Sequence, residues 1–291
     1  MAKAWFDSKN VLITGASSGI GLMLAKQLIV DHGCNVFGVG RNEKKLANAR
    51  EFISKSINEE TIKNKSVGFG SFEYLSVDLS TMDNWQKLKE HLMNIDFQVD
   101  ILINNAGVFI PFEKFETQDF EQCKKLFETN FYSQIYGTKT FLDNIEQVGG
   151  GILNISSSSA LCPVVGTAMY SASKSAIKGF TEALAIEMKG KMFVGVIFPG
   201  FTKTELFRNQ DNMSKFMYNI SSDADKVAKK IIRALRKKKM RTVIGFDAHL
   251  MNIFYRIMPK TTMKILAKVL KSKGGTAFNK VFDKSNNKKR G

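Results

Sequence analysis

Acidic residues are scarce in the last quarter of this chain. Residues 1–223 contain 23 Lys and Arg residues against 24 Asp and Glu residues, whereas residues 224–291 contain 20 basic residues and three acidic ones. The second segment therefore has a net charge of +17, while the first is nearly neutral. Because clustered charge of one sign selects partners of the other sign, any function given to the last quarter must account for this excess.

Cysteine and histidine are also scarce, with three residues of each, and they are widely spaced. They are Cys34, Cys123, Cys162, His32, His91 and His249. An odd number of separated cysteines is typical of a reducing compartment, and neither residue type shows the close spacing of metal ligands. We therefore expect no zinc or di-iron site.

Long apolar runs are missing as well. No run approaches the ~20 residues that a membrane-spanning helix needs, although 44% of the 291 residues are hydrophobic. The first residues, MAKAWFDSKNVLITG, enter a strand-like pattern at once and leave no room for a signal peptide. These absences predict a cytoplasmic protein, or one attached peripherally to the cytosolic face of a membrane.

From residue 10 to about residue 200, short apolar runs alternate with longer helical periods. Strands are expected at 10–15, 35–40, 72–78, 100–107, 151–157 and 192–200, and helices near 19–31, 42–57, 82–95, 117–146 and 168–189. This alternation predicts an α/β fold, a doubly wound parallel sheet of the Rossmann type with helices on both faces. The strand runs are apolar throughout, as expected of strands buried on both faces.

The regular pattern ends near Gly200. A Phe- and Met-rich irregular segment covers about 201–220, and a helix at 223–238 and a strand at 241–245 follow it. We assign residues 1–246 to one Rossmann-fold domain and residues 247–291 to a basic amphipathic extension. The lysine-rich end of the extension, residues 283–291, is expected to be disordered.

A glycine-rich bend joins the first expected strand to the first expected helix. In LITGASSGIG, residues 12–21, Gly15, Gly19 and Gly21 allow a tight turn and a close backbone approach to a pyrophosphate at the helix N-terminus. A turn that only packs the helix on the sheet is the alternative. The position directly after the first strand favours a dinucleotide site.

The end of the second strand indicates which dinucleotide is bound. An acidic residue there would bond the ribose 2′-hydroxyl of NAD, whereas a basic residue would neutralise the 2′-phosphate of NADP. The sequence GVGRNEKKL, residues 38–46, has Gly40 in the acidic position and Arg41 directly after it. Because a guanidinium suits bidentate phosphate binding, we interpret Arg41 as an NADP(H) determinant; the alternative is that Arg41 faces solvent.

A tyrosine and a lysine lie four residues apart in MYSASKSAIKGF, residues 169–180. Tyr170 and Lys174 would share one helix face. A nearby ammonium favours the phenolate and would lower the pKa of the phenol from about 10, which suits proton transfer near neutral pH. A chance pair on a solvated face is the alternative for this motif taken alone.

Several motifs should meet at the carboxyl edge of the parallel sheet, where α/β folds bind ligands. They are TGASSGIG at 14–21, NNAG at 104–107, Ser157, Tyr170 with Lys174, and Pro199, Gly200 and Thr204 after the sixth strand. Together they resemble the short-chain dehydrogenase/reductase family, in its TGxxxGxG and YxxxK branch, over about residues 8–245. The resemblance implies an oxidoreductase that uses NADP(H) to interconvert a ketone or aldehyde and an alcohol.

The resemblance also implies the roles of four catalytic residues. Tyr170 would be the general acid in carbonyl reduction or the base in alcohol oxidation, and Lys174 would lower its pKa and bond the nicotinamide ribose. Ser157 would hydrogen-bond the reacting oxygen, although the run of serines at 156–159 allows this assignment to slip by one. Asn130 would hold a proton-relay water behind the lysine.

The cofactor site that the resemblance implies contains residues from each motif at the carboxyl edge of the sheet. Its residues are Gly15, Ser17, Ser18, Gly19, Ile20, Gly21, Arg41, Asp78, Leu79, Asn105, Ala106, Gly107, Tyr170, Lys174, Pro199, Gly200, Thr202 and Thr204. Among them, the resemblance implies that Asp78 contacts adenine, that Asn105 to Gly107 line the floor of the site, and that Thr204 lies near the carboxamide and pyrophosphate.

Residues 201–222 occupy the position of the family's substrate lid and carry an apolar side. The expected substrate-binding residues are Ser157, Phe109, Val164, Tyr170, Phe201 and Phe207. Such a lining suits a lipophilic carbonyl compound, such as a lipid, a ketoacyl compound or a steroid. The alternative is that these apolar residues are ordinary core.

The extension resembles two amphipathic helices separated by Pro259. The first would carry Leu250, Met251, Ile253, Phe254, Ile257 and Met258 on one face, and the second a stripe of Lys260, Lys264, Lys268 and Lys271. The apolar faces would pack on the protein's own core or on a second subunit, or residues 247–273 would contact an anionic membrane. Nucleic acid is disfavoured as a partner because no reading motif is present.

Two functions stay open on the sequence. The first is the NADP(H)-dependent oxidoreductase acting on a small lipophilic carbonyl or alcohol, as a homodimer or homotetramer such as the family often forms. The second is a catalytically idle NADP(H)-binding redox sensor or scaffold. The complete set of Asn130, Ser157, Tyr170 and Lys174 favours the enzyme, because a binding protein needs no tuned phenol.

Overall fold

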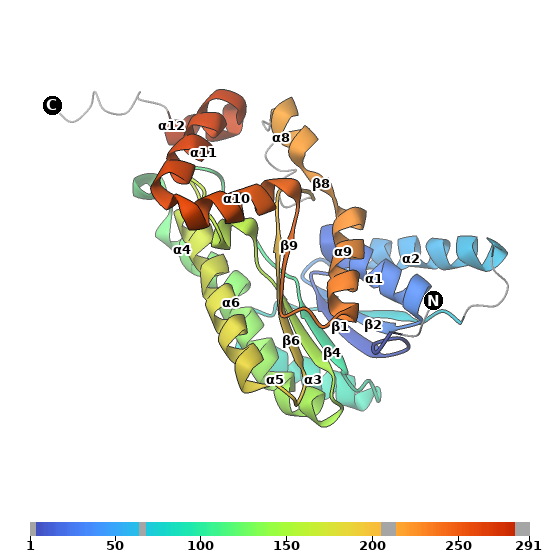
Figure 1. The fold of residues 1–291 in the computed structure, drawn as a ribbon. Helices are drawn as coiled ribbons and strands as arrows, with labels where there is room; N and C mark the ends of the chain where they lie inside the picture. The colour runs from blue at the N-terminus through green and yellow to red at the C-terminus, as the bar shows by residue number, and fades with distance from the viewer. Residues whose placement is uncertain (1–3, 64–67, 205–213, 283–291) are drawn as a thin grey trace.

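A seven-stranded parallel sheet forms the centre of the molecule. The computed structural model describes residues 4–63, 68–204 and 214–282, and its sheet has the strand order β3-β2-β1-β4-β5-β6-β9 (Figure 1). The chain winds outward from β1 in one direction and then from β4 in the other, which is the doubly wound arrangement. The predicted fold class is confirmed.

The strands of this sheet are β1 (Asn10–Thr14), β2 (Asn35–Gly40), β3 (Phe72–Ser76), β4 (Ile101–Asn104), β5 (Gly151–Ile155), β6 (Phe193–Pro199) and β9 (Arg241–Ile244), and a separate pair joins β7 (Thr202–Lys203) to β8 (Ser222–Asp223). The helices are α1 (Gly19–His32), α2 (Glu43–Lys63), α3 (Met82–Asn94), α4 (Phe120–Phe127), α5 (Ser133–Gln147), α6 (Ala168–Glu187), α8 (Lys215–Ile220), α9 (Ala224–Arg236), α10 (Phe246–Ile257), α11 (Pro259–Lys273) and α12 (Asn279–Phe282). A π-helical turn at Glu128–Tyr132 joins α4 to α5.

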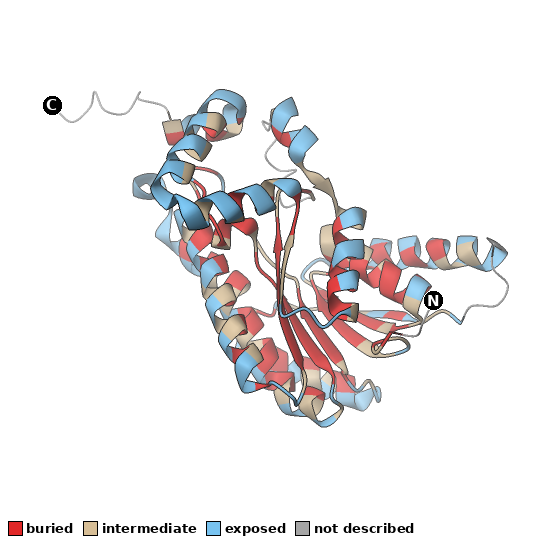
Figure 2. Ribbon diagram, viewed as in Figure 1, coloured by how far each residue is buried: buried red, intermediate tan, exposed pale blue. Residues whose placement is uncertain are grey.

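Successive residues of the central strands face opposite layers of helices. Ile13 belongs to a buried core that includes residues of α1, α2 and α9, whereas its neighbour Leu12 belongs to a second core with residues of α3 and α5. Ile103 and Leu102 of β4 divide in the same way. Burial on both faces explains the continuous apolar runs of these strands, and Figure 2 shows the sheet as the buried layer between exposed helix faces.

Two helices differ from the sequence prediction. The expected helix at 117–146 is divided into α4 and α5 by the π-helical turn, which carries Asn130. Such turns often occur at functional sites because they shift one side chain out of the regular helical register. α2 continues to Lys63, beyond its expected end at 57, because residues 58–63 contain neither glycine nor proline to end it.

The chain after β6 is more regular than predicted. Residues 201–223 contain β7, α8 and β8, while 205–213 lie outside the described residues. The expected helix and strand that follow are α9 and β9. α10, α11 and α12, which we call the tail helices, then lie at the carboxyl edge of the sheet (Figure 1). The end expected to be disordered, 283–291, falls outside the described residues.

Candidate active site

A cavity of about 680 Å³ lies at the carboxyl edge of the sheet. Every predicted cofactor residue lines it except Gly21, and so does every predicted substrate residue among those that the structure describes. The predicted Phe207 falls outside the described residues. Motifs that are far apart in the sequence therefore meet where the strand order predicts that they should.

The cavity has two ends of different chemistry. The glycine end is lined by residues 14, 15, 17–20, 40–42 and 78–80, and the apolar end by Phe109, Phe112, Val164 and Phe201. Tyr170 also lines the cavity. Its ring contacts Phe109 of the apolar end in an edge-to-face arrangement, with the ring centroids 4.8 Å apart. The phenol therefore lies beside the surface on which an apolar substrate would rest.

Glycines are required at the glycine end by backbone geometry. Gly15 and Gly19 have φ angles of +68° and +56°, and a Cβ atom on Gly21 would lie 2.3 Å from the carbonyl oxygen of Gly15. Gly21 thus allows α1 to close against the end of β1 and does not itself line the cavity. Ser18, the N-cap residue of α1, makes no side-chain capping bond, which leaves the first N–H groups of the helix available to an anion.

Thr14 joins this bend to the NNAG loop. Its hydroxyl accepts hydrogen bonds from the backbone N–H groups of Asn105 at 3.0 Å and Ala106 at 2.9 Å. The side-chain amide of Asn105 donates in return to the carbonyl oxygen of Thr14 at 2.9 Å. Thr14 was not among the predicted site residues, although its place beside Gly15 in the motif was a usable signal.

Basic side chains border the glycine end at the start of α2. Arg41, which directly follows β2, and Lys45 both line the cavity, with Asn42 between them. The side chain of Asn42 accepts a hydrogen bond from the N–H of Lys45 at 2.9 Å, which holds the first turn of the helix in place. Arg41 is exposed and lies at the border of the cavity, and its role toward a 2′-phosphate stays a prediction.

Ser157 is the serine that faces Tyr170. Its hydroxyl hydrogen-bonds the side chain of Tyr170 and accepts a bond from the N–H of Ser159 at 3.2 Å. The neighbouring Ser156 instead donates to the backbone carbonyl of Lys174 at 2.7 Å. The geometry therefore supports Ser157 over its neighbour for the predicted role.

The net shift of the Tyr170 pKa is opposite to the expected one. Burial raises the pKa of Tyr170 from 10.0 to about 12, and the hydrogen bond with Ser157 lowers it only in part. Burial also lowers the pKa of Lys174 from 10.5 to about 8, and the lysine nitrogen lies 5.9 Å from the centroid of the Tyr170 ring. Loss of hydration on burial therefore sets the direction of both pKa shifts.

Backbone groups hold Lys174 and Asn130 next to each other. The Nζ atom of Lys174 donates to the carbonyl oxygen of Ile155 at 3.1 Å. The Asn130 amide accepts from the N–H of Val108 at 2.7 Å and donates to its carbonyl oxygen at 2.9 Å. A Cβ atom on Gly107 would lie 3.3 Å from both Asn130 Oδ1 and Lys174 Nζ. Asn130 thus orients the NNAG loop, and its part in proton relay stays a prediction.

The tail helices pack against the apolar end, as the packing interpretation of the extension predicts. One buried cluster joins Phe112, Cys162, Val164 and Met217 to the tail residues Met251, Leu270, Phe278 and Val281. The rings of Phe112 and Phe278 lie 4.2 Å apart, centroid to centroid. Residues near the end of the chain therefore support the wall on which a substrate would rest.

One detail of the tail prediction is wrong. Met251 was expected on the same helix face as Leu250 and Ile253, but Met251 is buried while the other two are exposed. The periodicity placed the apolar residues of α10 on one broad face. The structure divides them, because α10 contacts the core only along the side that carries Ala248 and Met251.

Asp247, which the sequence reasoning missed, holds the loop after β6. Its carboxylate accepts a hydrogen bond from the N–H of Phe201 at 2.8 Å. A Cβ atom on Gly200 would lie 2.3 Å from the carboxylate oxygens, and one on Gly245 2.5 Å from Oδ1. Burial raises the pKa of this carboxyl group. The available signal was its isolation, because no other Asp or Glu occurs between residues 226 and 282.

Comparison with known proteins agrees with this geometry. The family model described as “short chain dehydrogenase” matches residues 9–215. The 11-beta-hydroxysteroid dehydrogenase 1A of Arabidopsis thaliana is 30% identical over 200 residues, which cover 68% of this chain and 53% of that protein. This chain therefore spans about half the length of that relative.

Two further proteins match over a larger share of their own length. The 3-dehydrosphinganine reductase of Danio rerio is 28% identical over 254 residues, which cover 84% of this chain and 74% of the relative. A crystal structure of actinorhodin polyketide ketoreductase with NADPH superposes with a TM-score of 0.71 at 24% identity, covering 83% of this chain and 97% of the other. The structural likeness concerns the fold.

Proposed function

This chain belongs to the short chain dehydrogenase family, and on that premise we propose that it is an NADP(H)-dependent oxidoreductase that interconverts a lipophilic ketone or aldehyde and the corresponding alcohol. The observation that carries the proposal is the position of Tyr170. Its hydroxyl bonds Ser157, and its ring packs on Phe109 of the apolar end. One side chain thus connects a proton source to an apolar surface in a cavity that also holds a dinucleotide motif.

The residues of the glycine end fit NADP(H). Glycines at 15 and 19 and the uncapped N-terminus of α1 provide a cradle for a pyrophosphate. Arg41 and Lys45 line the cavity at the end of β2, where positive charge would neutralise a 2′-phosphate. Lys174, buried beside Gly107, would hydrogen-bond the nicotinamide ribose.

In the direction of reduction, the protein supplies the proton and the orientation. A nicotinamide held in this cavity would supply the hydride for the reduction. The Tyr170 hydroxyl donates its proton to the carbonyl oxygen, while the Ser157 hydroxyl donates a hydrogen bond that stabilises the charge developing there. The pKa of Tyr170 is raised to about 12, so the phenol is protonated at neutral pH, as the acid in reduction must be, while the raised pKa makes it a weaker proton donor.

The proposed substrate class follows from the wall beside the phenol. Phe109, Val164 and Phe201 line the cavity and offer no charged group to a substrate, so an apolar ring or chain fits better than a sugar. The names of two relatives, a hydroxysteroid dehydrogenase and a dehydrosphinganine reductase, are those of enzymes for such lipids. A lipophilic substrate resides in membranes, so the proposal includes peripheral contact with a lipid surface.

The test is NADPH oxidation by the purified protein with ketones that range from small polar compounds through ketoacyl thioesters to steroids and sphingoid ketones. Tyr170→Phe should lower kcat by about a hundredfold to ten-thousandfold while NADPH affinity is retained. Tyr132→Phe, at a tyrosine that is 46% exposed, is the control and should keep full activity.

Two outcomes would contradict the proposal. Turnover that survives in Tyr170→Phe would remove the phenol from the mechanism. Tight NADPH binding without turnover of any ketone in the series would favour the redox sensor or scaffold instead of the enzyme.

A further inference from the structure

The apolar residues of α10 lie on two opposite sides of the helix. Ala248 and Met251 are buried, and Tyr255 packs against the same cluster that closes the apolar end. The outer stripe on the other side consists of Phe246, Leu250, Ile253, Phe254 and Ile257. Four of its members follow the 4-3-4 spacing of a single helical row, and Phe246 and Ile257 are 79% and 69% exposed. Packing among the described residues therefore does not account for the outer stripe.

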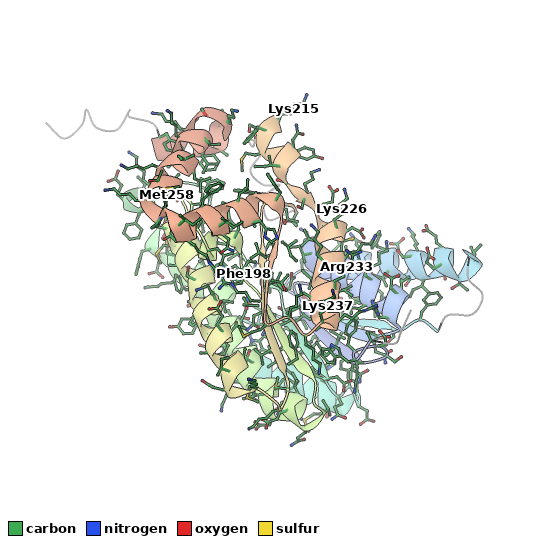
Figure 3. The ribbon with its side chains drawn as sticks, viewed as in Figure 1. Phe198, Lys215, Lys226, Arg233, Lys237 and Met258 are labelled. Atoms are coloured by element: carbon green, nitrogen blue, oxygen red, sulfur yellow. The ribbon has the colours of Figure 1, made fainter. Side chains whose placement is uncertain are left out.

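Exposed apolar residues continue onto α11. Met258, at the junction of α10 and α11 (Figure 3), is 48% exposed, and Met263 and Ile265 of α11 are 42% and 59% exposed. A single exposed apolar side chain on a protein surface is ordinary. A set of eight on two adjoining helices is the kind of surface that binds a partner or a membrane.

Basic residues accompany these apolar side chains. Residues 248–282 contain seven basic residues and no acidic one. They are Arg256, Lys260, Lys264, Lys268, Lys271, Lys273 and Lys280, and each of them is exposed. On α11 the lysines at 260, 264, 268 and 271 lie opposite the buried Leu270, so the charges face outward.

We propose that α10 and α11 form a docking surface for an anionic lipid bilayer. A bilayer of this kind accepts both components at once, since the outer stripe enters the region between headgroups and acyl chains while the lysines bond anionic headgroups. A second copy of this chain would instead bring two positive surfaces together in a symmetric interface. Contact is peripheral, because no helix in the described part of the chain is long and apolar enough to cross a membrane.

The same helices connect the bilayer to the cavity. Their inner side contributes Met251 and Leu270 to the cluster that supports the apolar end, while their outer side carries the docking surface. Docking would therefore place the apolar end within one helix thickness of the lipid. This delivery role rests on the proposed function, whereas docking itself does not require catalysis.

The test is co-sedimentation of the full chain with vesicles of phosphatidylcholine alone or mixed with phosphatidylserine. We expect at least about tenfold more binding to the anionic vesicles, and less binding as salt is raised. The double variant Ile253→Ser with Ile257→Ser should lose most of the additional binding to anionic vesicles. The double variant Lys264→Glu with Lys268→Glu should lose it as well. All four side chains are exposed, so the melting temperature should not change.

Matched controls separate this surface from general surface chemistry. Ile62→Ser with Ile186→Ser removes two isoleucines that are 81% and 65% exposed on other helices, and Lys87→Glu with Lys139→Glu makes the same charge change elsewhere. Both controls should bind as the wild type does. Equal binding to the two vesicle types, or full binding by the α10 and α11 variants, would overturn the proposal.

Two further results would separate membrane docking from dimer formation and from the proposed function. Conversion of a dimer to a monomer by Ile253→Ser with Ile257→Ser, with vesicle binding unchanged, would assign the surface to a second copy and overturn the proposal. The wild type could also bind vesicles, and the variants lose that binding, while the wild type oxidises no NADPH with any ketone. That result would support docking and contradict the proposed function.

Discussion

The two ends of the cavity are built from different kinds of interaction. At the glycine end, backbone atoms approach one another closely at Gly15 and Gly21, and the Thr14 hydroxyl bonds two N–H groups of the NNAG loop. At the apolar end, side chains from distant parts of the sequence fill space together, as Phe112 and Phe278 do. One end depends on the absence of side-chain atoms, and the other depends on their volume.

This difference means that the nucleotide-binding end tolerates few substitutions, whereas the substrate-binding end tolerates many. An added methyl group at Gly21 meets the backbone of Gly15, which can make room only if the loop shifts. Side chains at the apolar end can be exchanged if their total volume is kept. A single frame can therefore retain one nucleotide while its substrate wall changes. Substitutions at one end should therefore leave the properties of the other end unchanged, unless the two ends are coupled.

The largest effect is expected at the apolar end. Phe278→Ala removes a ring that is 1% exposed and should lower the free energy of unfolding by about 3–5 kcal/mol, measured by chemical denaturation. NADPH affinity should be unchanged, because among the described residues this ring belongs to the apolar cluster and does not line the cavity. Phe115→Ala, at a phenylalanine that is 61% exposed, is the control for both measurements. A large loss of NADPH affinity in Phe278→Ala would show that the two ends are one unit.

The converse change breaks the glycine end. Gly21→Ala adds a Cβ atom 2.3 Å from the carbonyl oxygen of Gly15, so the loop must shift at a cost of about 1–3 kcal/mol. NADPH affinity, followed by fluorescence titration, should fall by about ten- to a hundredfold. Gly179→Ala is the control, since an added Cβ in α6 meets nothing within 4 Å and should stabilise the helix slightly. Unchanged affinity in Gly21→Ala would remove α1 from the nucleotide site.

Arg41→Asp tests which nucleotide the glycine end prefers. Replacing a cation that lines the cavity by an anion should lower the ratio of NADPH to NADH affinity by about tenfold or more. Lys44→Asp makes the same charge change at a residue that does not line the cavity. An equal ratio in the wild type and Arg41→Asp would contradict the 2′-phosphate role.

The smallest effect concerns pH. The pKa of Lys174 is lowered to about 8 and that of Tyr170 is raised to about 12, so the lysine loses its charge first as pH rises, while the phenol stays protonated. The reductase rate at saturating NADPH should therefore fall to about half near pH 8 and continue to fall above it. NADPH affinity over the same pH range is the control. A rate that stays level up to pH 10 would mean that the charge of Lys174 does not assist the reaction.

Local patterns predicted most of the fold and the glycine end. The strands were visible as apolar runs, and Gly15, Arg41, Tyr170 and Lys174 lie in motifs whose members are close in sequence. Their meeting at one sheet edge follows from parallel strand order alone. A short motif carries its own geometry, so little tertiary information was needed to place it.

Features that depend on distant contacts were not predictable in this way. The inner position of Met251 is decided by what lies beneath α10, and Asp247 acquires its partner Phe201 from another loop. The raised pKa of Tyr170 results from burial, whereas its spacing from Lys174 predicted the opposite direction. In each case, the deciding quantity is an environment that periodicity does not report.

The place of Phe278 and Val281 in the buried cluster has a consequence for the order in which the protein is made. A ribosome synthesises the chain from its N-terminus, so every strand of the sheet is complete before these two residues leave the exit tunnel. The nascent chain can thus form its nucleotide cradle before the residues of α12 that complete the wall beside the phenol have been synthesised. The glycine end of the cavity is therefore expected to fold before the apolar end.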